Sequence, residues 1–294
     1  MDISEKYDVC VSALREFAEG TGFSDCVIGL SGGIDSSVVA VMAVDALGAS
    51  HVHGVLLPGP YSSDHSVTDA LELAACLGIE SRTVSIREPY EAFSNGLREA
   101  LGSAGLSGLA AENTQARCRM VCLMALSNTY GWMLLNTGNK SEAFMGYSTL
   151  YGDTAGAFAP LGGLYKTDVY AVGRWRNEQA QSQGQIAPIP ENVFVKPPSA
   201  ELSANQEDER SMGISYDVLD RLLIASQEDG LDADELVRRG FDEGDVARVL
   251  ATVRRTAFKR ALEPPFPTAS FYGGRAACDS EACDGESCSN KAYE

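Results

Sequence analysis

One stretch of the chain brings two adjacent glycines, an acid and several hydroxyls together between an apolar run and a helical pattern. It covers residues 27–37 and reads VIGLSGGIDSS. Glycine lets the backbone approach a bound anion closely, and the amides at a helix start favour negative charge. Bare phosphate would repel the acid, Asp35, but a phosphate that carries Mg²⁺ would not. The stretch therefore indicates a cradle for a magnesium-bound polyphosphate.

Two other chemistries share part of this pattern. The letters GLSGG match the turn of a hydrolase nucleophile, which needs a histidine base late in the chain. The histidines here are His51, His53 and His65, all in the first quarter of the sequence. A Walker loop requires a lysine followed by serine or threonine, and the stretch contains no lysine. A structural interpretation stays open, because the helix dipole by itself favours an acid such as Asp35 in a first turn.

Apolar periodicity on both sides of this stretch predicts strands that alternate with helices. Strand, helix and strand at this spacing form a parallel βαβ unit, so we expect an α/β fold with a doubly wound parallel sheet flanked by helices. Strands are expected at residues 26–30, 51–58, 82–86 and 132–138, and helices at 3–18, 35–47, 64–77, within 89–130, and at 167–181, 216–226, 233–239 and 242–260.

No internal repeat or linker divides the body of the chain. We therefore predict one domain over residues 1–273 and a disordered tail over residues 274–294. A proline-rich and acid-rich stretch at 188–213 is expected to form a mobile loop, and loops of this length inside a domain are usually functional.

The cysteines divide into two groups. The first group lies in apolar segments, where cysteine usually behaves as a small buried hydrophobe, and is expected to be reduced. The second group lies in the tail, where disorder is expected and metal capture is the alternative. The first group is Cys10, Cys26, Cys76, Cys118 and Cys122, and the second is Cys278, Cys283 and Cys288.

The overall charge restricts the partners. Forty-one acids against 23 bases give a formal charge of −18, which disfavours nucleic acid because phosphate-backbone binding depends on lysine and arginine. No segment has the roughly 18 uninterrupted apolar residues of a membrane span, and the N-terminus lacks a basic region followed by an apolar one. We expect a cytoplasmic protein that binds neither nucleic acid nor membrane.

The S-G-G-x-D-S order in the stretch resembles the signature of the N-type ATP pyrophosphatases, whose fold is adenine nucleotide alpha hydrolase-like and Rossmann-like. Further motifs follow in the order seen in NAD synthetases, so the chain is identified as a member of that family over about residues 24–262. These motifs are ENTQARCRM (112–120), TGNKSE (137–142), GYSTLYGD (146–153), LYKTDVY (164–170) and KPPSAEL with QEDE (196–209).

The resemblance implies a ligase reaction. ATP would activate the nicotinate carboxylate of deamido-NAD through an adenylated intermediate, and NAD, AMP and pyrophosphate would leave, with Mg²⁺ as cofactor. Free ammonia is the expected nitrogen donor, since a glutaminase would need an additional domain with its own nucleophilic cysteine; a separate glutaminase subunit is the alternative. A tRNA-thiolating enzyme with the same signature and a non-catalytic nucleotide-binding module are the rival functions.

The resemblance also implies which residues bind nucleotide and metal. Asp35 and Glu142 would ligate Mg²⁺, and Lys166 would follow the moving phosphate as a compact cation. The expected ATP contacts are Gly29, Leu30, Ser31, Gly32, Gly33, Ile34, Asp35, Ser36, Thr137, Lys166 and Ser199.

A third set of residues is implied for the dinucleotide. Arg117, Asp153 and Lys259 would bind deamido-NAD, with Arg117 reaching across from a partner subunit, which implies a homodimer. Lys166 and Asp153 are the expected catalytic residues. Arg119 is expected to point elsewhere, as readily a surface residue as a site residue.

The chain departs from the ammonia-dependent bacterial pattern at three positions. It has Leu150 and Ala157 where those members tend to carry a lysine and an acid, and Phe258 where many carry histidine. The segment LYGDTAGAFAPL is more similar to the synthetase domain of glutamine-dependent enzymes. These departures concern the binding of the nicotinate end and the source of nitrogen.

Overall fold

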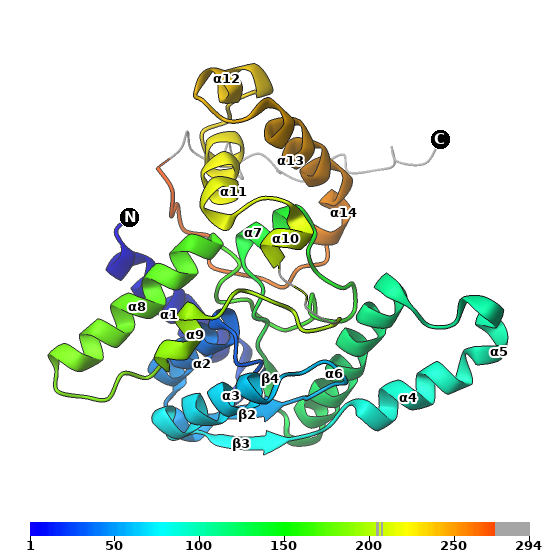
Figure 1. Ribbon diagram of the computed structural model, residues 1–294. Coiled ribbons are helices and arrows are strands. Elements are labelled where there is room, and N and C mark those ends of the chain that lie inside the picture. The colour runs from blue at the N-terminus through cyan, green and yellow to red at the C-terminus, as the bar shows by residue number, and fades with distance from the viewer. Residues whose placement is uncertain (204–205, 207, 274–294) are drawn as a thin grey trace, which may run out of the picture.

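A four-stranded parallel sheet forms the centre of the protein, with helices on both of its faces (Figure 1). The structure is a computed structural model and describes residues 1–203, 206 and 208–273. The spatial order β3–β2–β1–β4 confirms the predicted doubly wound α/β class. The strands are β1 (Cys26–Gly29), β2 (Val52–Leu56), β3 (Glu80–Thr83) and β4 (Met133–Leu134).

The helices match the predicted order, and several short ones add to it. The helices are α1 (Ile3–Thr21), α2 (Ile34–Leu47), α3 (Asp64–Leu77), α4 (Arg87–Gly96), α5 (Arg98–Leu101), α6 (Gly108–Tyr130), α7 (Lys140–Met145), α8 (Lys166–Ser182), α9 (Glu191–Val195), α10 (Asp208–Met212), α11 (Tyr216–Leu223), α12 (Ala233–Arg238), α13 (Glu243–Arg255) and α14 (Ala257–Arg260), with short turns η1 (Ala49–His51), η2 (Gly102–Ala104) and the π-helical η3 (Ile224–Glu228).

Successive residues of a strand point to opposite sides of a sheet, and in the central strand β1 both sides are buried, whereas the edge strand β3 is partly exposed. Cys26 and Ile28 of β1 pack into the larger core with α1, α2 and α8, whereas Val27 packs into a smaller core with α6. A third core joins α11, α12 and α13 to Tyr165, which precedes α8. Figure 1 shows these three helices at the top of the molecule, away from the sheet.

Strand boundaries are the main error of the sequence prediction. The edge strand was expected at 82–86 but pairs at Glu80–Thr83. The amides of Val84 and Ile86 still bond to Leu56 and Pro58, so the chain continues past the regular ladder. Pro58 has no N–H to donate in return, which ends the pairing. The last strand, expected at 132–138, is only two residues long before it turns into the loop that carries Asn136.

The 188–213 stretch is more ordered than a simple loop. It contains the short helices α9 and α10, which sequence periodicity did not predict. Its mobility stays a prediction. The tail predicted at 274–294, with its three cysteines, lies outside the described residues.

The described cysteines are free thiols, as expected. Cys10 and Cys26 are buried, and burial raises the pKa of Cys10 to about 12, so that thiol is inert. Cys76 is exposed, which corrects the expectation that all five lie inside. No helix in the described part of the chain is long and apolar enough to cross a membrane.

Candidate active site

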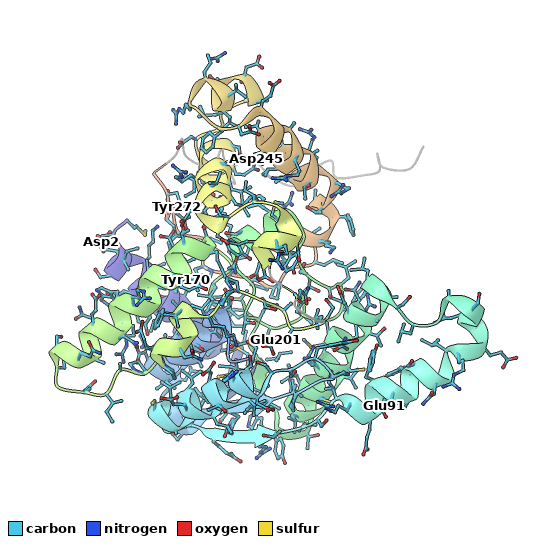
Figure 2. All side chains as sticks on the ribbon, viewed as in Figure 1. Asp2, Glu91, Tyr170, Glu201, Asp245 and Tyr272 are labelled. Atoms are coloured by element: carbon cyan, nitrogen blue, oxygen red, sulfur yellow. The ribbon has the colours of Figure 1, made fainter. Side chains whose placement is uncertain are left out.

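A cavity of about 410 Å³ opens at the carboxyl ends of β1, β2 and β4. Ligands of open α/β sheets bind at this edge. Tyr170 and Glu201, two of the lining residues, lie toward the middle of the view in Figure 2. The predicted residues that line the cavity are Gly29, Leu30, Ser31, Gly33, Ile34, Asp35, Ser36, Thr137, Glu142, Asp153, Lys166, Ser199 and Lys259. Gly32 and Arg117 are the predicted site residues that do not.

Gly32 lies behind the cavity wall and shapes it. Its φ is +74°, and a Cβ built there would stand 2.2 Å from the carbonyl oxygen of Ser66 on α3. The turn is fixed further by hydroxyls: Ser31 and Ser36 contact each other at 2.9 Å, and Ser37 donates to the Gly33 carbonyl at 2.9 Å. Gly32 therefore acts through the shape of the turn and not through a surface that a ligand could touch.

Gly32→Ala is expected to lower the free energy of unfolding by about 3 kcal/mol, since backbone strain adds to a clash that neither backbone can relieve. Gly78→Ala is the matched control. Its φ is +64° but its Cβ would meet nothing within 4 Å, so only strain of about 1–2 kcal/mol is expected. Urea unfolding of both variants checks this. Equal losses would show that the contact with Ser66 is unimportant.

The start of α2 has the character of an anion site. Its N-cap is Gly33, and no described side chain caps the helix. The first turn, with Asp35 and Ser36, lines the cavity. The amides of such a turn and the helix dipole favour a negatively charged ligand at this position.

An acid, a lysine and a second acid form the centre of the site. Nζ of Lys166 donates to Oδ2 of Asp35 at 2.5 Å and to Oε1 of Glu142 at 3.0 Å. The Lys166 side chain is only 2 % exposed, against 19 % and 18 % for the two acids. The three groups come from the starts of α8, α2 and α7. The resemblance assigned all three to one site, and the structure brings them together.

Asn139 holds the two acids in register, and sequence analysis missed it. Its Nδ2 donates to Oδ1 of Asp35 at 2.8 Å, while its Oδ1 accepts the amide of Glu142 at 3.1 Å. Asn139 is therefore both the N-cap of α7 and a positioning group for Asp35. Its place three residues before Glu142 is the spacing of an N-cap signal, which could have identified it.

Burial and charge set the protonation of this group. Burial raises the pKa of Glu142 to about 7, although the attraction of Lys166 opposes the rise. Burial alone would lower the pKa of Lys166, but the attraction of Asp35 and Glu142 outweighs it, and the pKa lies above the ordinary lysine value. Lys166 is thus a permanent cation inside the cavity.

The two acids fit Mg²⁺ in part. Carboxylate oxygens are the ligands that Mg²⁺ prefers. Asp35 and Glu142 each place one carboxylate oxygen against Nζ of Lys166, so the two acids face the same point. Among the described residues, no group of three or more potential ligands has a geometry that could hold a metal. A magnesium ion here would therefore need oxygens from phosphate and water, as is usual for this ion.

A third carboxylate, Asp208 of α10, also lines the cavity. Its Oδ1 is buried without a hydrogen-bond partner, and burial raises the pKa of the group. The cavity therefore carries an acceptor that the described side chains leave unsatisfied, which is the environment expected where a cation or a donor-bearing ligand binds.

The opposite end of the cavity is formed by the loop at 146–153. Asp153 accepts the amide of Thr149 at 2.5 Å, and Lys259 donates to the carbonyls of Gly146 and Ser148 at 2.7 and 2.5 Å. Burial raises the pKa of Asp153 and lowers that of Lys259. The two groups predicted to bind substrate thus also hold the loop in place.

The two arginines of α6 lie in different environments. Arg117 is exposed, lies outside the cavity lining and donates to the Leu150 carbonyl at 3.1 Å. Arg119 lines the cavity, donates to the Leu57 carbonyl at 3.0 Å and has its pKa lowered by burial. The surface role left open for Arg119 is therefore wrong. Helical spacing could have placed it, since Glu112, Ala116, Arg119 and Leu123 recur along the cavity face.

The segment at 196–201 covers one side of the cavity and is fastened to α3. Glu201 accepts the Ser63 hydroxyl at 2.8 Å and the Ser66 hydroxyl at 2.6 Å, and Lys196 donates to Ser66 at 2.5 Å. Glu201 itself has a φ of +48°. Ser199 lies on this segment and lines the cavity, as predicted.

Comparison with known proteins gives one family. The family model described as NAD synthase matches residues 6–263. The glutamine-dependent NAD(+) synthetase of Thermotoga maritima is 44% identical over 256 residues, which are 87% of this chain and 43% of that protein. The chain therefore spans about half the length of the curated relatives it matches.

Two solved structures agree in fold with this chain over nearly their whole length. NMN synthetase from Francisella tularensis superposes with a TM-score of 0.74 at 31% identity, over 88% of this chain and 96% of that one. The NH3-dependent NAD synthetase from Campylobacter jejuni gives a TM-score of 0.70 at 29% identity over the same shares.

Proposed function

This chain belongs to the NAD synthase family, and we propose that it amidates deamido-NAD to NAD with ATP, releasing AMP and pyrophosphate. The observation that carries the proposal is the buried Lys166 between Asp35 and Glu142, beside the glycine turn at the mouth of α2. A cation, two magnesium-type acids and free helix amides in one cavity are what a triphosphate requires.

The chemistry has two halves. In the first, an oxygen of the nicotinate carboxylate attacks the α-phosphorus of ATP, the bond to the bridging oxygen breaks, and pyrophosphate leaves with that electron pair. In the second, ammonia attacks the activated carbonyl carbon, the bond to AMP breaks, and a proton is lost from nitrogen. We assign Lys166 to the charge that develops on pyrophosphate, because it is a fixed cation in a buried site.

Other residues bind and orient the substrates. The first turn of α2 would hold phosphate oxygens, and Thr137 and Ser199 would contact the nucleotide from the two sides of the cavity. Asp35 and Glu142 would hold Mg²⁺, which supplies Lewis-acid neutralisation of the phosphates when it is bound. Asp153, Lys259 and Arg119 would bind the deamido-NAD end. We assign Asp153 to accept the proton lost from nitrogen, since its raised pKa makes it a stronger base than an ordinary aspartate.

The names of the relatives favour a different nitrogen source from the free ammonia expected from the sequence. The curated relatives are named glutamine-dependent, which favours the alternative of glutamine-derived ammonia over free ammonia alone. We propose that a glutaminase supplies ammonia to this site, while the site itself reacts with ammonia from either source. The likeness to an NH3-dependent enzyme supports the second part of that proposal.

The remaining assignments are proposals of the same kind. Arg117 is exposed beside the cavity, which fits a residue that reaches the site of a second copy in a homodimer. We also propose a cytoplasmic location for this reaction. The tRNA-thiolating rival is disfavoured by the formal charge of −18.

One assay tests the function and its substrate. With ATP, Mg²⁺ and ammonium, we expect pyrophosphate release that requires deamido-NAD and yields NAD in equal amount. Because one structural neighbour is an NMN synthetase, the acid precursor of NMN is the competing substrate. A higher kcat/KM for that mononucleotide would show that it, and not deamido-NAD, is the substrate. Pyrophosphate release in the absence of both acids would refute the proposal. For residues 1–294 by themselves, glutamine is expected to support turnover only in the presence of a glutaminase activity.

A further inference from the structure

The start of α8, which carries Lys166, has no capping side chain of its own. Its N-cap is Tyr165, whose side chain makes no capping bond. Two amides of this turn are instead satisfied from elsewhere. The amide of Lys166 donates to the Ser141 hydroxyl at 2.8 Å, and the amide of Thr167 donates to Oδ2 of Asp220 at 2.7 Å.

Asp220 also holds the other side of this arrangement. The Ser141 hydroxyl donates to Oδ1 of Asp220 at 2.5 Å and accepts the Lys166 amide, so Ser141 links Asp220 to the start of α8. Asp220 is 1% exposed and Ser141 0%. One carboxylate of α11 therefore fixes two helices at once, α8 through Thr167 and α7 through Ser141.

These two helices carry the residues whose distance matters for the reaction. Ser141 immediately precedes Glu142, and Thr167 immediately follows Lys166. A carboxylate at a helix start also interacts favourably with the helix dipole, which holds the turn in place. A shift of one helix start against the other would change the contact between Nζ of Lys166 and Oε1 of Glu142, at 3.0 Å, directly.

We propose that Asp220 is a positioning residue for the reaction, which sets the start of α8 against the start of α7 so that Lys166 and Glu142 meet. It does not line the cavity in which the substrates are proposed to bind. The inference rests on the proposed function, because it concerns the same site.

Asp220→Asn tests the proposal with little change in side-chain volume. Misplacement of a group by about 1 Å can cost about 100-fold in rate, so we expect kcat for pyrophosphate release to fall on the order of tenfold or more. KM for ATP should change by less than about threefold, since most phosphate contacts remain. Asp217→Asn removes the same charge from the same helix at an exposed position and is expected to leave kcat unchanged.

A second readout does not depend on turnover. Amide hydrogen exchange at the first turn of α8 should be faster in Asp220→Asn than in Asp217→Asn, while exchange in β1 and α2 stays as in the wild type. Faster exchange throughout the protein would mean that Asp220 only supports the fold, and this would overturn the proposal. Inactive wild-type protein would instead count against the proposed function.

A double-mutant cycle decides whether Asp220 acts through Ser141. Ser141→Ala breaks the same chain of bonds without removing a charge, and it serves if Asp220→Asn does not fold. The two changes should be non-additive, so that Asp220→Asn lowers kcat less in the Ser141→Ala background than in the wild type. Independent, fully additive effects on kcat would contradict the positioning role.

Discussion

Lys166→Met is expected to lower kcat for pyrophosphate release by about 100- to 1,000-fold, the usual effect of removing one preorganised charge from a transition state. The methionine keeps the buried stem of the side chain and removes only the ammonium. Lys166 is the residue whose Nζ contacts both Asp35 and Glu142, so its loss removes positive charge from the centre of the site.

The same substitution should also destabilise the protein in a way that metal can reverse. Two carboxylates would face each other without their cation, which we expect to lower the free energy of unfolding by about 2–3 kcal/mol, below the usual cost for fully buried pairs. The expected cost is below the usual one because the side chains of Asp35 and Glu142 keep 19 % and 18 % of their exposure. Urea unfolding with and without Mg²⁺ measures this, and Mg²⁺ should stabilise the variant more than the wild type.

Lys140→Met is the matched control for this experiment. Lys140 pairs with Glu228 at 2.5 Å, at side-chain exposures of 21 % and 20 %, and neither residue lines the cavity. Its loss should cost about 1 kcal/mol and leave kcat near the wild-type value. Should Mg²⁺ stabilise both variants equally, the two acids would not form a metal site.

Glu142→Ala is expected to abolish turnover, with a fall in kcat of at least about 100-fold, while the fold stays intact. The fold should survive because α7 keeps its cap, since Asn139 accepts the main-chain amide of residue 142 and not its side chain. Removing a carboxylate whose pKa burial raises to about 7 also relieves an unfavourable buried charge at neutral pH.

Two measurements separate the metal role of Glu142 from a structural one. Binding of Mn²⁺, followed by electron paramagnetic resonance in the presence of ATP, should weaken in Glu142→Ala, whereas the melting temperature should change little. Glu228→Ala removes a glutamate of similar exposure that also pairs with a lysine, and it should leave Mn²⁺ binding unchanged. Near-normal turnover by Glu142→Ala would refute its assignment.

The α/β class, the order of the main elements and the glycine turn all follow from local features of the sequence. Apolar periodicity predicted the strand at 26–30 and the helix at 64–77 because both depend on which residues must face a core. The turn before Asp35 was recognisable because only glycine tolerates its backbone angle and its close neighbour. Such features involve residues a few positions apart.

Only the tertiary structure decided how distant parts of the chain meet. Lys166 meets Asp35 across 131 positions of sequence, and Ser141 meets Asp220 across 79. Whether Arg117 or Arg119 faces the cavity depends on how α6 is rotated against the sheet, and where the pairing of the edge strand ends depends on Pro58, two residues after β2. These contacts arise from the packing of whole elements, which periodicity within one element does not specify.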